Sequence, residues 1–143
     1  MVEVGGEIRV RGRNPDGGPW RIAIERPAPG GRHAEAVMTL TDRAVATSGD
    51  YRNFFEVDGV RFSHTIDPRT GRPITHKLAS VTVLHETTME ADALATAFMV
   101  LGPEEAFKLA EWKHIAALFI IKTEQGFDER STSTFSETIK VIP

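Results

Sequence analysis

The chain has 143 residues, of which 41% are hydrophobic and 26% are charged, a composition typical of a folded globular domain. Acidic and basic residues are interleaved and the net charge is −3, which excludes the basic stripe of duplex-binding proteins, so no nucleic-acid partner is expected. The absence of cysteine excludes disulfides, thiolate metal sites and cysteine nucleophiles. We expect residues 1–143 to form a single domain.

The first residues predict a strand that enters a turn, because Met1 is followed directly by strand-like residues 2–4 and then by Gly5 and Gly6. This start contains no signal sequence, and no apolar run approaches the roughly 20 residues needed to cross a bilayer. Since proteins seldom begin inside a strand, we expect the complete protein to have a further N-terminal portion.

The first half of the sequence is rich in predicted β-strands. Alternating polar and apolar residues predict half-buried strands at 7–11 and 20–25, separated by a turn rich in Asn, Pro and Gly. Apolar stretches at 36–40 and 44–47 predict two more strands, the second leading to a Ser-Gly-Asp sequence.

The clearest predicted hairpin joins residues 54–57 to residues 60–64 through a two-residue Asp-Gly loop, which suits positive φ. The predicted register pairs Val57 with Val60, Glu56 with Arg61, and Phe55 with Phe62. Apolar pairs then share one face of the hairpin and an ion pair lies on the other.

The second half predicts one more buried strand at 78–84, followed by two helices. The first helix covers 88–101 and ends at Gly102, and the second runs from Pro103 to about residue 113, the usual placement of Pro and Gly. An apolar strand at 116–121 and a polar strand ending near residue 135 complete the chain. The pattern predicts an α+β fold, a mostly antiparallel sheet with two consecutive helices packed on one face.

The helix predicted at 88–101 is apolar on nearly every side and contains no Lys or Arg, which predicts that it is buried. Asp92 and Thr96 lie one turn apart on one face. A buried carboxylate must be protonated or meet a cation, and Mg²⁺ suits a carboxylate together with a hydroxyl. Alternatively, Asp92 caps a backbone segment or pairs with a distant Arg, and Thr96 bonds back to its preceding turn.

Residues 63–73 hold a second concentration of reactive groups. His64 ends a predicted strand and precedes an Asp-Pro-x-x-Gly turn. A histidine can accept a proton near neutral pH, and the alternative is a satisfied core histidine. Glycine-bearing turns at Gly6 and at Ser48 and Gly49 would let backbone N–H groups approach an anion, although neither follows the P-loop or the dinucleotide pattern.

Five sequence motifs occur in a fixed order, and none of them is specific alone. They are residues 5–9 (GGEIR), 20–27 (WRIAIERP), 47–51 (TSGDY), 64–71 (HTIDPRTG) and 91–97 (ADALATA). Together they closely resemble the C-terminal half of the FAD:protein FMN transferases, the ApbE-type flavin transferases formerly called thiamine biosynthesis lipoproteins. The resemblance extends over essentially all 143 residues.

The resemblance implies an enzyme that uses Mg²⁺ to cleave the pyrophosphate of FAD and attaches FMN to a Thr or Ser hydroxyl of an acceptor flavoprotein, releasing AMP. It implies that Asp92 and Thr96 bind the metal. It further implies that Ile66 lies against FAD and that His64 is the base for the acceptor hydroxyl.

Gly6, Ser48 and Gly49 are assigned to cofactor binding together with Ile66. Some members have a second Asp where this chain has Ala95, so its metal affinity rests on fewer groups. The other half of the family's sequence, which supplies further FAD contacts and another metal ligand, is not in this chain.

Three functions are therefore considered: the transferase, an FAD pyrophosphatase that yields AMP and FMN, and a catalytically silent structural or binding fragment. The silent fragment would self-associate through the face that the other half would cover. Family members are typically exported and lipid-anchored, so the resemblance implies a periplasmic or membrane-tethered location.

Overall fold

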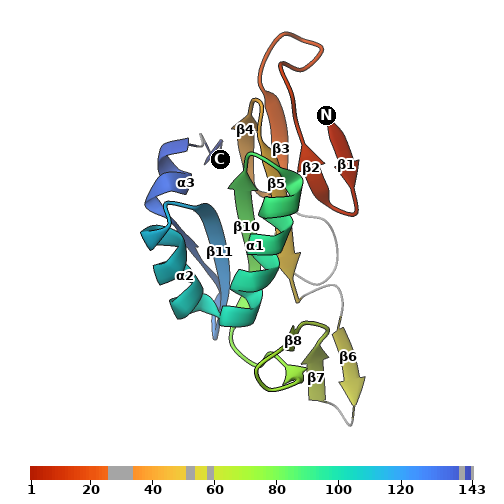
Figure 1. Ribbon diagram of the computed structural model, residues 1–143, viewed down its shortest axis with the longest axis vertical. Coiled ribbons are helices and arrows are strands. Elements are labelled where there is room, and N and C mark those ends of the chain that lie inside the picture. Colours follow the sequence, from red (N-terminus) through yellow and green to blue (C-terminus); the bar gives the residue numbers. More distant parts are fainter. Residues whose placement is uncertain (26–33, 51–53, 58–59, 139–140, 143) are drawn as a thin grey trace.

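The computed structural model describes residues 1–25, 34–50, 54–57, 60–138 and 141–142, and a six-stranded sheet forms its centre (Figure 1). In spatial order the strands are β1 (Val2–Val4), β2 (Glu7–Arg9), β5 (Ala44–Gly49), β10 (Leu78–His85), β11 (Ala116–Thr123) and β12 (Gly126–Ser131). Every pairing in this sheet is antiparallel. The predicted α+β class with a mostly antiparallel sheet is confirmed.

Two consecutive helices cover one face of this sheet, as the sequence predicts. Helix α1 (Thr88–Leu101) packs on β5 and β10, and α2 (Pro103–Trp112) packs on β11. The side chain of Thr87 caps α1 by accepting the backbone N–H of Glu90. Gly102 separates the two helices.

A second sheet and a third helix cover the opposite face. The sheet contains β13 (Val141–Ile142), β4 (Ala34–Leu40) and β3 (Trp20–Glu25), and the helix is α3 (Ser133–Thr138). The predicted polar strand ending near Phe135 is wrong at its end, because β12 stops at Ser131. The Thr132 hydroxyl accepts the N–H of Phe135, which starts a helical turn, and Phe135 is buried against the second sheet.

Hydrophobic clusters lie on both faces of the central sheet, and β10 and β11 contribute to both. On the helix side the ring of Phe119 packs against Phe98 and Phe107, with centroids 5.9 and 5.7 Å away. On the other side Leu84 and Leu118 belong to the cluster beneath the second sheet. Burial on both faces explains why these two strands are nearly continuous apolar runs.

Two small hairpins lie at the end of the molecule opposite the β1–β2 hairpin (Figure 1). They are β6 (Phe54–Val57) with β7 (Val60–Ser63), and β8 (Ile66–Asp67) with β9 (Arg72–Pro73). The predicted register of the first hairpin is confirmed at all three pairs. Its Asp-Gly loop, residues 58–59, lies outside the described residues. Within the described parts of the chain, no helix has the length and apolarity needed to traverse a membrane.

Candidate active-site cavity

A cavity of about 640 Å³ lies beside β5, next to the point where its pairing with β2 ends. Strand β2 pairs with β5 only at Ala44 and Val45, and beyond these pairs Thr47, Ser48 and Gly49 of β5 line the cavity. Further walls come from the β1–β2 turn, β3 and α1. The predicted site residues that line it are Gly6, Ser48, Gly49, His64, Asp92 and Thr96. These six residues come from four segments that are distant in sequence: the β1–β2 turn, the end of β5, the connection between β7 and β8, and α1.

Asp92 and Thr96 line the cavity from α1, but both residues are exposed, so the predicted burial of this helix on every side is wrong. Its buried stripe consists of Ala91, Ala95, Phe98 and Met99. The exposed residues of the helix mix polar with small or apolar side chains, and they are Met89, Glu90, Asp92, Ala93, Thr96 and Ala97. Consequently Asp92 remains hydrated and its charge needs no buried partner.

The oxygen atoms of Asp92 and Thr96 fit a hard cation. Neither side chain makes a hydrogen bond or ion pair with a described residue, so the predicted alternatives of capping, Arg pairing and back-bonding are not realised there. Within the described ranges, no group of three or more His, Asp, Glu or Cys is arranged to hold a metal ion. Mg²⁺ is commonly bound by one or two protein oxygens, with water and phosphate oxygens at its other positions.

His64 reaches the cavity from the short connection between β7 and β8. Its neighbours Ser63 and Thr65 are buried, at 5% and 9% exposure, and the Ser63 hydroxyl accepts the backbone N–H of Thr65 at 3.2 Å. His64 itself is exposed. The backbone is thus held in place on either side of an imidazole that contacts the open cavity.

The two glycine-bearing segments differ in structure. Gly5 and Gly6 form the β1–β2 turn with φ values of 67° and 109°, which favour glycine. Ser48 and Gly49 were expected in a turn, but they are the last residues of β5 and pair with β10. That turn assignment is wrong because the strand continues through Gly49 on the side where β10 supplies its partners.

Ile66 is the one predicted cofactor contact that the cavity does not include. It begins β8, pairs with Pro73 and is 47% exposed. Its assignment to FAD binding stays a prediction, and in this structure Ile66 lies two residues from His64 on the same segment.

The cavity also includes residues that the motifs did not single out as functional. Arg21 of β3 lines it, and the Thr47 and Thr82 hydroxyls, which also line it, are bonded to each other at 2.8 Å. Alternation along the strand at 20–25 is the signal that could have identified Arg21, because its neighbours Trp20 and Ile22 pack toward the core.

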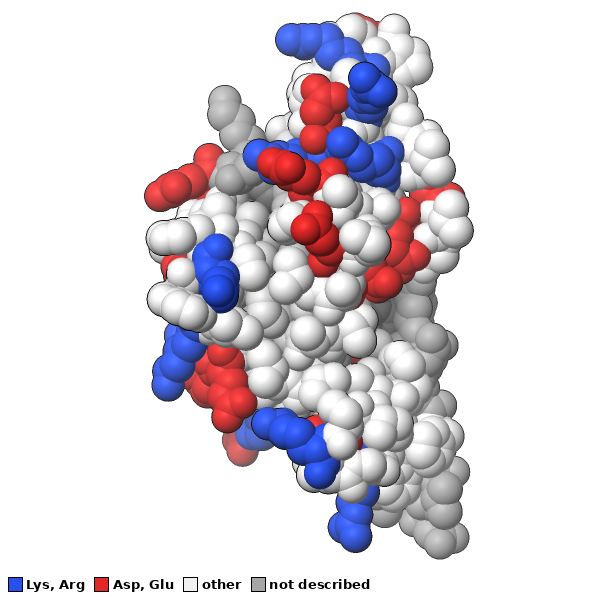
Figure 2. Space-filling model, viewed as in Figure 1, with Lys and Arg blue, Asp and Glu red and all other residues white. Residues whose placement is uncertain are grey.

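Carboxylates outnumber cationic side chains around the cavity. Glu3, Glu7, Glu25 and Asp92 line it together with Arg21. Figure 2 shows acidic side chains gathered beside the N-terminal half of α1, whereas the surface over its C-terminal half is uncharged. An anionic ligand would meet net repulsion here unless a cation accompanied it.

The predicted Asp-Pro-x-x-Gly turn is confirmed next to the site. The Asp67 carbonyl accepts the N–H groups of Thr70 and Gly71, and its carboxylate accepts side-chain and backbone N–H groups of Arg69. The hydrogen bond from the Arg69 guanidinium holds the pKa of Asp67 below its ordinary value, and the same pair raises the pKa of Arg69.

Solved structures that are similar to this chain include flavin transferases named ApbE. The apo crystal structure of flavinyl transferase ApbE from Pseudomonas stutzeri superposes with a TM-score of 0.81 at 53% identity, covering 94% of this chain and 42% of the other. Flavin transferase ApbE from Vibrio cholerae gives a TM-score of 0.84 at 51% identity, covering 96% and 43%.

Sequence comparison identifies the same family. The ApbE family profile matches residues 1–119. The FAD:protein FMN transferase of Vibrio cholerae serotype O1 is 55% identical over 135 residues, which are 94% of this chain and 40% of the relative. That of Haemophilus influenzae is 51% identical over 138 residues, or 96% and 40%. The chain belongs to the ApbE family, and it spans about 40% of the length of these curated relatives.

Proposed function

We propose that this chain takes part in the Mg²⁺-dependent transfer of FMN from FAD to a Thr or Ser hydroxyl of an acceptor flavoprotein, with release of AMP. Family membership supports flavin transfer. The observation that carries the proposal is the single cavity lined by His64, Asp92, Thr96 and the two glycine-bearing segments. Residues beyond this chain, in a longer protein or a partner, would supply the remaining contacts.

Asp92 and Thr96 are the proposed protein ligands of the metal. Both present unbonded oxygens to the cavity from one face of α1. A bound Mg²⁺ would neutralise charge on the pyrophosphate of FAD. The excess of carboxylates around the cavity supports a need for a cation, because these carboxylates would repel a diphosphate that binds alone.

His64 is the proposed base. The acceptor oxygen would attack the phosphorus of the FMN moiety, forming a new P–O bond, while the P–O bond to the AMP moiety breaks and AMP leaves. The proton of the acceptor hydroxyl would pass to an imidazole nitrogen of His64. Its exposure in the cavity leaves room for an acceptor side chain to reach it.

Incubation of the chain with FAD, Mg²⁺ and an acceptor flavoprotein tests the proposal. AMP measured by chromatography and a mass increase of the acceptor equal to the FMN moiety are the expected products. Asp92→Ala should abolish both, and His64→Ala should slow both about 100- to 10,000-fold, which leaves a measurable residual rate. Asp128→Ala, which removes an exposed carboxylate on β12, should change neither. Unchanged activity of Asp92→Ala would refute the metal role.

Hydrolysis of FAD to AMP and FMN is the second candidate, and the openness of the site favours it. His64, Asp92 and Thr96 are all exposed, so water can reach the positions where an acceptor hydroxyl would bind. Free FMN formed in the absence of any acceptor protein would identify this activity.

A silent structural or binding fragment is the third candidate, favoured by the coverage of only about 40% of the relatives. It predicts that FAD with Mg²⁺ does not raise the melting temperature. The silent fragment would also self-associate, which sedimentation measures. A periplasmic or membrane-tethered location is proposed from the family resemblance alone.

A further inference from the structure

His76 lies between β9 and β10, and its ring reaches the last turn of α1. Its Nε2 atom is 2.7 Å from the carbonyl oxygen of Met99. Since a carbonyl oxygen only accepts, Nε2 carries a proton and donates it. The Nδ1 atom accepts the backbone N–H of Leu78 at 3.3 Å. Both nitrogens are therefore engaged, Nε2–H as the donor to Met99 and Nδ1 as the acceptor from Leu78.

The Met99 carbonyl belongs to the final turn of α1, where backbone carbonyls have no partner within the helix. Met99 is fully buried, and the His76 N–H supplies the missing donor. The ring also lies against Gly102, where an added Cβ would be 2.9 Å from its Cδ2 atom. The end of α1 is thus shaped to receive this imidazole.

The same segment is tied back to the residue next to His64. The backbone N–H of Ile74 donates to the carbonyl of Thr65 at 3.0 Å, and Ile74 belongs to the hydrophobic cluster on the helix side of the sheet. A short path of contacts therefore runs from the end of α1 through His76 and Ile74 to Thr65 and His64.

We propose that His76 is a positioning residue that holds the segment bearing His64 against α1, the helix that bears Asp92 and Thr96. Its catalytic consequence rests on the proposed function. A base must lie within about 3 Å of the proton it accepts, and a displacement of about 1 Å costs roughly 100-fold in rate. The contact of His76 with α1 would fix that distance.

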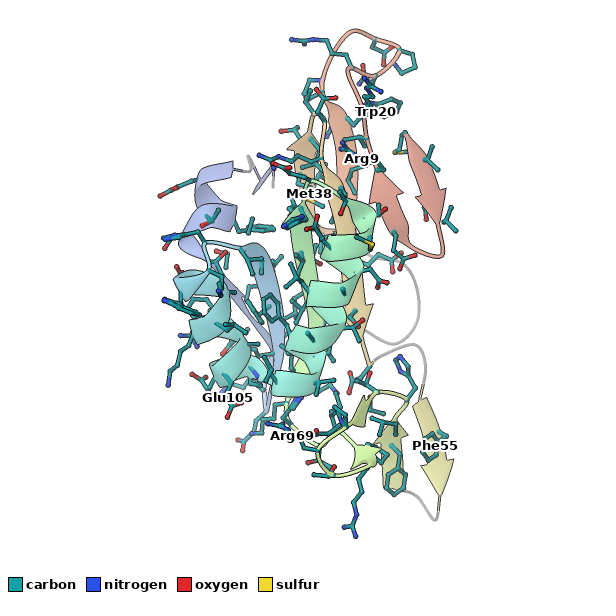
Figure 3. The ribbon with its side chains drawn as sticks, in the orientation of Figure 1. Arg9, Trp20, Met38, Phe55, Arg69 and Glu105 are labelled. Carbon is teal, nitrogen blue, oxygen red and sulfur yellow. The ribbon has the colours of Figure 1, made fainter. Side chains whose placement is uncertain are left out.

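A second polar contact joins the segment to the helices, but it is weak. The Arg69 guanidinium is 3.9 Å from the Glu105 carboxylate, and both side chains are more than half exposed, at 59% and 68%. Figure 3 shows the two residues below the C-terminal end of α1. Exposed pairs of this kind contribute little, so the bond from His76 to Met99 is the stronger of the two polar contacts.

Two matched substitutions separate the bonds of His76. In His76→Gln the amide nitrogen replaces Nε2 and can still donate to Met99. In His76→Asn an oxygen can accept from Leu78, but the side chain is too short to reach Met99. His114→Asn is the control, because His114 is exposed with φ of 53°, a conformation that Asn tolerates.

Hydrogen exchange of the Ile74 amide is the first readout, and it needs no activity. We expect exchange about tenfold faster in His76→Asn, and wild-type exchange in His76→Gln and His114→Asn. Unchanged protection of Ile74 in His76→Asn would overturn the proposal.

The rate of AMP release is the second readout. We expect kcat to fall about 10- to 100-fold in His76→Asn, to recover in His76→Gln, and to show no further fall when His76→Asn is added to His64→Ala. An equal fall in both backgrounds would mean a general structural role and overturn the proposal. If wild type releases no AMP, the proposed function fails, and hydrogen exchange alone decides whether His76 positions the segment.

Discussion

Asp92 and Thr96 show how a helix can offer two oxygen ligands without burying a charge. Their face of α1 is turned away from its buried stripe, and the carboxylate stays in contact with water. The exposed position of Asp92 therefore avoids the free-energy cost of burying a charge in the absence of a ligand. A metal ion bound by these two hydrated side chains would keep its other coordination positions for water or phosphate oxygens.

Replacement of Asp92 by Ala should leave the fold intact. Because Asp92 has no partner among the described residues and Ala favours helices, we expect the free energy of unfolding to stay equal or rise by up to about 0.7 kcal/mol. Urea denaturation measures this quantity. Saturating Mg²⁺ should raise the melting temperature of wild type and of Asp128→Ala, but not that of Asp92→Ala. Destabilisation of Asp92→Ala by several kcal/mol would show that the carboxylate has a structural role.

The junction between α1 and α2 depends on one glycine. Gly102 has φ of 83° and ψ of 172°, a region that is essentially restricted to glycine, and it also borders the ring of His76. Backbone geometry and side-chain packing therefore require the same small residue at this position.

Gly102→Ala should lower the free energy of unfolding by about 2–3 kcal/mol, because it combines backbone strain with a close contact to His76. Gly71→Ala is the matched control, since Gly71 has φ of 68° but open space around a Cβ, and it should cost about 1 kcal/mol. Urea titration compares the two. Equal losses would mean that the contact with His76 adds nothing.

The contribution of the Asp67–Arg69 pair to the stability of the fold should depend on pH, and the lowered pKa of Asp67 sets the direction. The folded pKa of Asp67 is lowered, so the pair stabilises the fold above the ordinary Asp pKa and loses this effect as pH falls through the folded value. Asp67→Asn should be slightly less stable than wild type at neutral pH, with a difference that shrinks below about pH 4. Thermal melts of both proteins across this pH range measure the difference. A difference that grows on acidification would contradict the assignment.

The sequence predicted the elements well where a local signal exists. Thr87, Gly102 and Pro103 mark the ends of the helices, and the pairing of Phe55 with Phe62 follows from a two-residue loop. The path of Ser133–Thr138 was missed, because its helix depends on capping by Thr132 and on burial of a single Phe beneath a distant sheet.

The candidate site could be predicted as a set of residues, but not as a surface. Spacing along the helix places Asp92 and Thr96 on one face, yet nothing local tells whether that face is covered. Alternation along β3 turns Arg21 away from the core, but only the assembled fold shows that this side chain lines the same cavity as the β1–β2 turn. Ile66 was assigned from resemblance, and its role stays a prediction.

At the scale of the whole molecule, the central sheet is shared by two hydrophobic clusters. Trp20 packs against the cluster beneath the second sheet, whereas Phe119 lies in the cluster under the helices. If residues 1–143 form a single domain, which stays a prediction, loss of one cluster must destabilise the other through β10 and β11.

Phe119→Ala should lower the free energy of unfolding by about 3–5 kcal/mol, because it empties the centre of the helix-side cluster. The unfolding midpoint of Phe119→Ala should be lower than that of wild type. Circular dichroism of the helices and fluorescence of Trp20, on the other face of the sheet, should give the same midpoint. Trp112→Ala, at an exposed position, removes the second Trp and isolates the Trp20 signal at little cost. Two separate transitions would indicate two independently folding units.

The β1–β2 hairpin is joined to β5 by only two residue pairs, Ile8 with Val45 and Arg9 with Ala44. Strands held by so few bonds detach at a lower free-energy cost than the doubly covered centre of a sheet. Because the turn of this hairpin is also a wall of the cavity, detachment of this sheet edge would widen the cavity. A molecule bound there would contact both the hairpin and β5 and so hold them together. Its residence time would depend on how often the hairpin detaches from β5.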